Sequence, residues 1–309
     1  MAIDARLKSL FVLPAVGLSA LLFVLSLVML LISADNRIGW LGAAMTAAVL
    51  PAVLARLMWR PTARTAEFLP AELLVMVVGL LVAVQGMYGN FVASWGLYQE
   101  LSGAIVSAIN PSAATTPGLV GIFCSALFLL YLFWYSRFGR NADARLDVGG
   151  KLPDFEVYDL DGNMVRSTEM LGAPAVFLFY RGNWCPICMA QIDELVARQA
   201  DMQELGIVTC LISPQPEAAS RQLAERHNVD FRFLVDRGNK AAELLEIAVK
   251  SGIPLGMPGD YPPDTVMPTM FVTTAGGTIV FSDQTDNYRV RPEPDIFLAI
   301  LRRAGRLAA

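Results

Sequence analysis

The sequence predicts an α-helical transmembrane bundle of four helices followed by an α/β domain. Hydrophobic residues make up 55% of the 309 residues and charged residues 17%, and the two kinds are unevenly distributed. Residues 1–145 hold nine basic and six acidic residues, a net charge of +3, whereas the remainder holds fifteen and twenty-two, a net charge of −7. An apolar, slightly basic half before an acidic, charge-rich half indicates a membrane domain joined to a soluble one. Strands and helices are expected to alternate only in the second half.

The membrane domain is predicted from four apolar spans. Each is close to the roughly 20 residues that a helix needs to cross the hydrocarbon core. The first span resembles a signal peptide, but its apolar core exceeds the roughly 7–15 residues of such a segment and further spans follow, so we expect it to be retained. The spans cover residues 11–32, 38–59, 73–92 and 119–135.

The orientation is predicted from the Lys and Arg residues at the ends of the spans. They precede the first span, lie between the second and third, and follow the fourth: Arg6, Lys8, Arg56, Arg60, Arg64, Arg137, Arg140 and Arg145. The opposite side has only Arg37. The spans predict an integral multi-pass protein of the lipid bilayer, expected in a bacterial inner membrane. The positive-inside rule predicts that both termini and the second domain lie in the cytoplasm. That orientation requires an even number of spans.

The predicted domains are a membrane domain over residues 1–140, a polar linker over 141–150 and an α/β domain over 151–309. A hairpin with its turn at Asp161-Gly162 opens the last domain. The continuous apolar run over 175–180 is typical of a central strand covered on both faces. Alternating strands and helices predict a sheet with helices on both sides. Strands are expected at 207–212, 231–235, 270–274 and 278–281, and helices from Cys185 to about 205, at 241–250 and at 295–305.

The apolar run ends in a turn that opens onto Cys-Pro-Ile-Cys at 185–188. Pro186 fits the first turn of a helix, where its missing N–H costs nothing. Cys185 then lies at the helix N-terminus, where the free amides and the positive end of the dipole favour the nucleophilic thiolate. Arg181 adds a nearby positive charge. Cys188 lies on the same helical face and within reach of a disulfide with Cys185, so the pair is predicted to be redox-active.

The alternative interpretations of this pair are half a zinc site or two buried structural cysteines. A tetrahedral zinc site needs further ligands, and only Cys124, Cys210 and His227 remain, none of them paired at ligand spacing. No metal and no cofactor are therefore expected. Nucleic acid is not an expected partner either, because the second half has no basic patch.

Residues 146–301 resemble the thioredoxin-like superfamily, in particular the redoxin branch of alkyl hydroperoxide reductase C and thiol-specific antioxidant (peroxiredoxin-like) proteins. Three segments carry the resemblance: Gly150-Lys-Leu-Pro-Asp-Phe before the hairpin, Phe179-Tyr-Arg-Gly-Asn-Trp-Cys-Pro-Ile-Cys, and Met267-Pro-Thr before an apolar strand. The first half resembles no family that we can name.

The resemblance implies further site residues beside Cys185 and Cys188. Met267-Pro268 is similar to the cis-proline segment of thioredoxins, so Pro268 is expected to be cis and Met267 to pair with a substrate chain through its backbone. Apart from the resemblance, the position of Trp184 next to Cys185 indicates that its ring shields the thiolate and presents a flat apolar face to a partner; a hydrophobic cap over the strand end is compatible with that role. Phe179 stands where thioredoxins have a buried Asp that accepts a proton.

Three functions remain open. The first is a membrane-anchored thiol–disulfide oxidoreductase, in which Cys185 attacks and Cys188 resolves, serving cell redox homeostasis. The second is a peroxiredoxin-like peroxidase with antioxidant activity. Aligned on Phe179-Tyr180, its peroxidatic cysteine falls on Cys188, but the family's Pro and Thr fall on Arg181 and Cys185. The family's active-site Arg has no counterpart before the strand at Met270, where Met267-Pro268 stands instead. The sequence therefore favours the first function. The third is a non-catalytic redox sensor. The expected partners are protein thiols or disulfides or a hydroperoxide, and a reductase.

Overall fold

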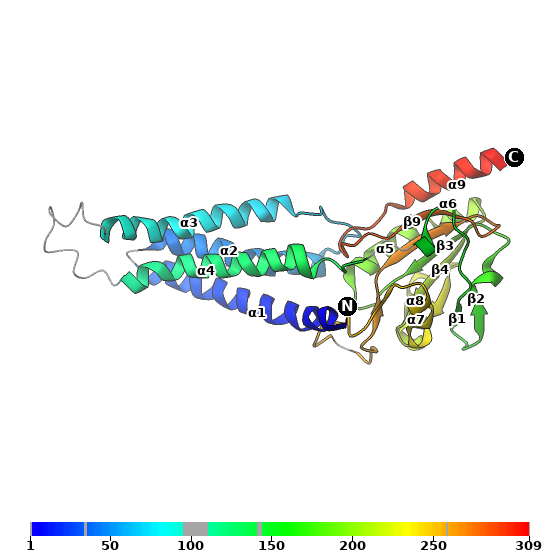
Figure 1. Ribbon diagram of the computed structural model, residues 1–309, viewed down its shortest axis with the longest axis horizontal. Helices are drawn as coiled ribbons and strands as arrows, with labels where there is room; N and C mark the ends of the chain where they lie inside the picture. The colour runs from blue at the N-terminus through cyan, green and yellow to red at the C-terminus, as the bar shows by residue number, and fades with distance from the viewer. Residues whose placement is uncertain (1, 34–35, 95–110, 141–143, 258, 309) are drawn as a thin grey trace. The chain divides into compact units, whose positions relative to one another are not determined.

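A computed structural model describes residues 2–33, 36–94, 111–140, 144–257 and 259–308. The chain forms two compact units (Figure 1). The first, here called the helical unit, contains Phe11–Trp59 and Phe68–Tyr135. The second, here called the sheet unit, contains Ser136–Ala309 together with Met1–Leu10 and Arg60–Glu67. The connection between the second and third helices therefore belongs to the sheet unit.

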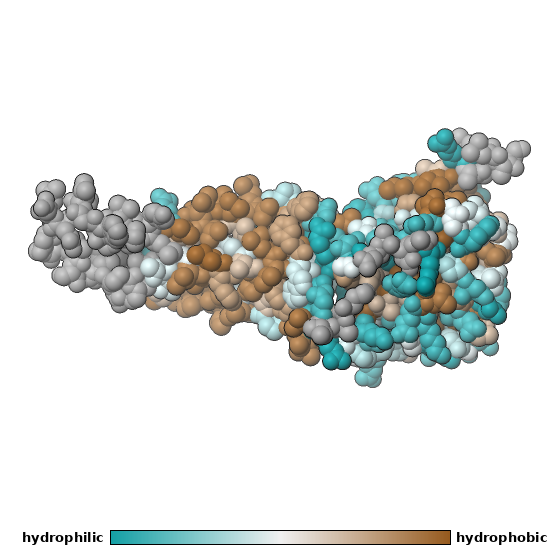
Figure 2. Space-filling model, in the orientation of Figure 1, coloured by the Kyte–Doolittle hydropathy of each residue, from teal (hydrophilic) through white to brown (hydrophobic). Residues whose placement is uncertain are grey.

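The helical unit consists of long apolar helices, and Figure 2 shows hydrophobic residues over the face of this unit that is in view. Among the described residues, three helices are long and apolar enough to cross a membrane: Asp4–Ile32, Arg37–Trp59 and Thr115–Tyr135. The predicted span over 73–92 falls in a fourth helix, whose described apolar stretch, Pro70–Gln85, is shorter. The helical first half is thus confirmed, with three candidate spans. The helices are α1 (Ala2–Ile32), α2 (Arg37–Trp59), α3 (Pro70–Ser94) and α4 (Pro111–Leu130), which continues as the π-helical turn η2 (Tyr131–Tyr135).

Small residues explain how α2 and α3 pack. A Cβ atom on Gly42 of α2 would lie 2.3 Å from the backbone nitrogen of Ala83 and 2.5 Å from the carbonyl oxygen of Gly79, both in α3. No side chain fits in that space. Close approach of backbones at Gly and Ala is the usual basis of helix association where burial from water gives no driving force.

The sheet unit is built on a seven-stranded sheet with the strand order β2-β1-β5-β4-β3-β8-β9. Strands β3, β4 and β5 are parallel and the other neighbours are antiparallel. The central strand β3 is buried at every residue, as its continuous apolar sequence predicts. The strands are β1 (Glu156–Tyr158), β2 (Met164–Arg166), β3 (Ala175–Phe179), β4 (Val208–Ser213), β5 (Arg232–Val235), β8 (Thr269–Thr273) and β9 (Ile279–Asp283).

Helices and short pairings complete this unit (Figure 1). A separate two-stranded ladder joins β6 (Ala248–Val249) to β7 (Thr265–Val266). The aromatic core lies at the centre of the sheet, where Phe177 stacks on Phe271 with ring centroids 4.9 Å apart. The helices are α5 (Pro186–Ala197), α6 (Gln199–Glu204), α7 (Glu217–His227), α8 (Lys240–Leu244) and α9 (Pro294–Ala308), with the short turns η3 (Ala144–Leu146), η4 (Ser167–Met170) and η5 (Arg237–Asn239).

The helix ends differ from the predictions in two places. The single helix expected from Cys185 to about residue 205 is divided at Arg198, whose N–H bonds the carbonyls of Leu195 and Val196 and closes α5 early. The helix expected over 241–250 ends at Leu244, because Glu246 has a positive φ of 57° and the chain then enters β6. Residues 144–150, the described part of the predicted linker, pack on the sheet: Gly149 N–H donates to Ile279 O at 2.8 Å.

Candidate active site at the start of helix α5

Cys185 is the N-cap residue of α5. Its backbone is extended (φ −93°, ψ 105°), Pro186 follows at the first helical position, and its sulfur accepts the N–H of Cys188 at 3.3 Å. A side chain in this position satisfies one of the free amides of the first turn and faces the positive end of the helix dipole. The local sequence favours this helix start, because proline is preferred at the first helical position.

The two cysteines differ in their preferred protonation state. Both are free thiols, and Cys185 is 3% exposed and Cys188 fully buried. Burial alone would raise the pKa of Cys185, but the hydrogen bond from the Cys188 thiol, the charge of Arg181, the Cys188 N–H and the charge of Arg291 together lower it to about 6. Burial and the neighbouring Cys185 raise the pKa of Cys188. Cys185 is therefore the thiolate and Cys188 keeps its proton.

Arg181 and Trp184 lie together in the loop before Cys185. The Arg181 guanidinium lies 4.5 Å from the centroid of the Trp184 ring and donates to the carbonyl oxygen of Gly252 at 2.6 Å. Gly182 has a φ of 141°, and a Cβ there would lie 2.8 Å from Nε1 of Trp184. Only glycine fits at position 182, because the Trp184 ring lies so close to its backbone.

A buried amide network holds the other side of this loop, and sequence reasoning missed it. Gln215 accepts the N–H of Asn183 at 2.8 Å, and its amide nitrogen donates to the hydroxyl of Tyr180 at 2.9 Å and to Ser220 at 3.0 Å. Burial raises the pKa of the Tyr180 phenol. Because every member is hydrogen-bonded, the network gives the turn between β3 and α5 one geometry.

Arg291 is the principal residue of the site that the sequence analysis did not identify. It lies in the segment between β9 and α9, is 3% exposed, and its charge acts on both Cys185 and Cys188. Burial lowers the pKa of Arg291, while the charges of Cys188, Cys185 and Asp283 raise it. Its only signal in the sequence is an Arg among polar residues of a loop, and such residues are mostly exposed.

The prediction of a cis peptide at Pro268 is wrong, because every peptide bond among the described residues is trans. Met267 is 2% exposed, and its N–H donates to Ile247 O at 2.7 Å. Its carbonyl oxygen accepts the hydroxyl of Thr269 at 2.8 Å. Both polar groups of the Met267 backbone are therefore used within the chain, which fixes the conformation before Pro268.

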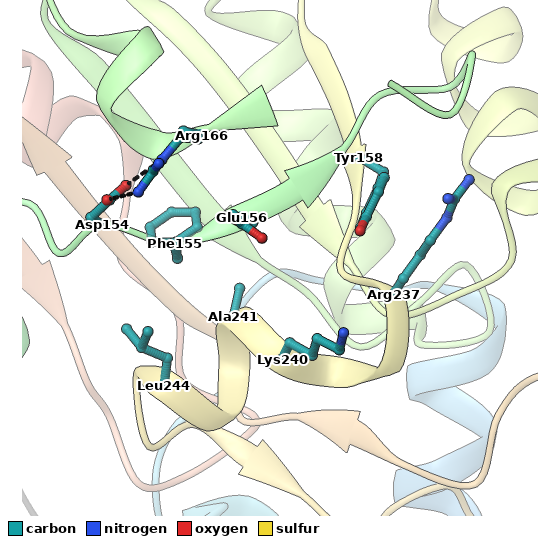
Figure 3. Close-up of a pocket in the computed structure, with 9 residues that line it drawn as sticks. All are labelled: Asp154, Phe155, Glu156, Tyr158, Arg166, Arg237, Lys240, Ala241 and Leu244. Atoms are coloured by element: carbon teal, nitrogen blue, oxygen red, sulfur yellow. Dashed lines mark hydrogen bonds and ion pairs between the residues drawn. The ribbon is translucent and has the colours of Figure 1, made fainter. Parts of the chain in front are cut away.

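A pocket of about 220 Å³ lies elsewhere in the sheet unit, between β1 and α8 (Figure 3). None of the predicted site residues lines it. Its polar groups are largely paired. Arg166 makes an ion pair with Asp154 and Arg237 makes one with Glu217. The Arg237 guanidinium also lies 4.2 Å from the centroid of the Tyr158 ring. The chemistry at Cys185 is separate from this pocket. Among the described residues, no group of three His, Cys, Asp or Glu side chains could hold a metal ion.

Comparisons with known proteins agree with a redox site. Residues 148–282 match the AhpC/TSA family. Peroxiredoxin Bcp of Bacillus subtilis (strain 168) is 28% identical over 102 residues, which are 33% of this chain and 65% of that protein. Thiol-disulfide oxidoreductase ResA of Bacillus thuringiensis subsp. konkukian is 23% identical over 121 residues, 38% of this chain and 66% of that protein. The chain thus spans just under two thirds of the length of these relatives.

Among solved structures, the peroxidoxin BcpB of Mycobacterium tuberculosis is similar to this chain with a TM-score of 0.42 and 22% sequence identity. The similarity covers 51% of this chain and 97% of that protein.

Proposed function

We propose that the protein, whose residues 148–282 match the AhpC/TSA family, is a membrane-anchored thiol–disulfide oxidoreductase. Cys185 is the attacking thiol and Cys188 the resolving thiol. The observation that carries the proposal is the Cys185 sulfur itself, which accepts the Cys188 N–H at the start of α5 and lies in the field of Arg181 and Arg291. Such a sulfur is a thiolate at neutral pH.

The proposed reaction moves two electrons from the cysteine pair to a substrate disulfide. The Cys185 thiolate attacks one substrate sulfur, the substrate S–S bond breaks, and the other substrate sulfur leaves as a thiolate that takes the Cys188 proton. The Cys188 thiolate then attacks the Cys185 sulfur, forming the Cys185–Cys188 disulfide and releasing the second substrate thiolate. A dithiol reductase returns the pair to the reduced state. Arg181 and Arg291 stabilise the thiolate, and Trp184 covers it.

Membrane anchoring through four spans is part of the proposal. Lys8, near the start of α1, donates to the carbonyl oxygen of Arg137, just after η2, at 2.7 Å. Phe11 and Trp134 make an edge-to-face contact with centroids 5.4 Å apart. The first and last helical segments thus begin and end on one side, which supports an even number of crossings. Because the basic residues flank the same ends of the helices, the proposed location of the redox domain is the cytoplasm.

Reporter fusions test this orientation. Alkaline phosphatase inserted after residue 102 should be active and the same enzyme at the C-terminus inactive, because only the first reaches the periplasm. Green fluorescent protein at the two positions should give the opposite pattern. Active phosphatase at the C-terminus would place the redox domain outside the cytoplasm.

The catalytic proposal is tested on the full chain, reduced and purified in detergent. The protein is mixed with insulin as a protein disulfide, quenched with iodoacetamide and digested for mass spectrometry. Cys188→Ser should accumulate a mixed disulfide at Cys185, and Cys185→Ser should react no faster than free thiol. A pair that is oxidised once and that no reductase recycles would indicate the redox sensor instead.

A peroxidase is the second candidate, and the burial of Cys185 favours it, because a hydroperoxide can reach a sulfur that is 3% exposed more easily than a protein can. The raised pKa of Cys188 argues against attack by Cys188. In this scheme the Cys185 thiolate attacks one oxygen of hydrogen peroxide and the O–O bond breaks. The sulfur becomes a sulfenic acid, and the leaving hydroxide takes a proton from solvent to give the first water. Cys188 then displaces the second water and forms the disulfide. Fast oxidation by hydrogen peroxide beside slow exchange with insulin would select this function.

A further inference from the structure

The segment that carries Arg291 is hydrogen-bonded by Arg64, which lies in the connection between α2 and α3. Nε of Arg64 donates to the carbonyl oxygen of Arg291 at 3.1 Å, and Nη2 donates to that of Pro292 at 3.2 Å. The same guanidinium makes an ion pair with Glu194 on α5, the helix that Cys185 caps. Arg64 therefore ties the backbone of Arg291 to the helix that carries the cysteines, although it is distant from both in the sequence.

The other flank of Arg291 is held by the same connection. Arg289 is fully buried, and its guanidinium donates to the hydroxyl of Thr65 at 2.8 Å and to the carbonyl oxygens of Ala66 and Glu67 at 3.2 and 2.8 Å. The N–H of Thr65 donates to the carbonyl oxygen of Arg289 at 2.9 Å. Residues 64–67 thus contact the chain on both sides of Arg291.

The Arg291 side chain has little of its own to fix it. Nη1 donates to the carbonyl oxygen of Val290 at 3.0 Å, and Nε and Nη2 are buried without a hydrogen-bond partner among the described residues. The charged groups that act on it are Cys185, Cys188, Asp283 and Arg181. With so few hydrogen bonds at the guanidinium, its distance from the sulfurs depends on where the backbone is held.

We propose that Arg64 is a positioning residue, which sets the reactivity of Cys185 by holding the backbone of Arg291 beside the cysteine pair. The inference rests on the proposed function of that pair. On this inference, the connection between α2 and α3 contributes a residue to the redox site. Without Arg64, the 291–292 segment loses its bond to α5, and the Arg291 charge moves away from the sulfurs.

The test measures the rate of Cys185 alkylation by iodoacetamide between pH 4.5 and 9, on the reduced full chain in detergent. Arg64→Ala should raise the midpoint of the pH profile and lower the rate at pH 5 by about 3- to 10-fold, the equivalent of half to one pKa unit. Arg64→Lys keeps the charge but has no fork to bond two carbonyls and a carboxylate, so it should restore the rate in part. Arg60→Ala, in the same connection, is the matched control and should leave the profile unchanged.

Glu194→Ala separates positioning from direct electrostatics. Removing an acidic charge from α5 would by itself favour the Cys185 thiolate and lower the midpoint. Loss of the tie to Arg64 should instead raise it. A lowered or unchanged midpoint in Glu194→Ala, or an unchanged one in Arg64→Ala, would overturn the inference while leaving the proposed function intact. A wild-type profile with its midpoint near 9 would instead contradict the thiolate on which both rest.

Discussion

The hydrogen bond between the two thiols can be tested by replacing its donor. After burial, which acts in the opposite direction, the Cys188 thiol is the largest influence on the pKa of Cys185 and lowers it. With a pKa of about 6 instead of the ordinary 9.0, the thiolate fraction at pH 7 is about 90% instead of about 1%. A hydrogen bond to a charged group contributes about 1.5–3 kcal/mol, or one to two pKa units. Cys188→Ala should therefore raise the pKa of Cys185 above 7, whereas Cys188→Ser keeps an O–H donor and should hold it near 6.

Thiolate absorbance at 240 nm against pH, with alkylation of the Cys185 peptide as a second readout, measures this value in both variants. Both substitutions leave the backbone N–H at position 188, which also bonds the Cys185 sulfur, so the pair isolates the side-chain donor. Equal midpoints in Cys188→Ala and Cys188→Ser would refute the assignment of the low pKa to the thiol–thiolate hydrogen bond.

Three further outcomes are expected. Arg291→Met should raise the pKa of Cys185, because it removes a buried charge that favours the thiolate; an unmoved alkylation midpoint would contradict this. Phe271→Ala should lower the stability of the sheet unit by about 3–5 kcal/mol, since it removes a fully buried ring stacked on Phe177; thermal unfolding in detergent measures it, and a change below about 1 kcal/mol would count against the packing. The folded pKa of Cys185 is lowered, so its contribution to stability is present above the ordinary value of 9.0 and is lost as the pH falls through about 6; the difference in melting temperature between the reduced protein and Cys185→Ala should shrink over that range.

Much of the fold follows from local patterns. The buried run of β3 and the Cys-Pro start of α5 depend on neighbouring residues only, and the structure has both at the predicted positions. The alternation of strands and helices predicted the α/β domain, and residues 148–282 match the AhpC/TSA family. The early end of α5 at Arg198 was not predictable, because the sequence continues with residues that suit a helix.

The remainder of the site depends on contacts between distant segments. The position of Arg291 near the cysteines depends on how β9 and α9 pack on the rest of the domain. No periodicity or residue spacing in the sequence predicts that packing. The backbone before Pro268 also depends on a distant segment, because the N–H of Met267 pairs with Ile247. The resemblance predicted a cis isomer from a short motif, and that prediction took no account of tertiary contacts such as this hydrogen bond.

The division of the chain into interleaved units limits how its parts can be exchanged. A foreign domain grafted after residue 140 without an arginine at the position of Arg289 would remove the guanidinium that now donates to the carbonyls of Ala66 and Glu67. Conversely, a soluble fragment cut at the same point would leave a fully buried guanidinium without Thr65 and Ser136. A domain exchange after residue 140 therefore requires the α2–α3 connection to be exchanged together with that domain.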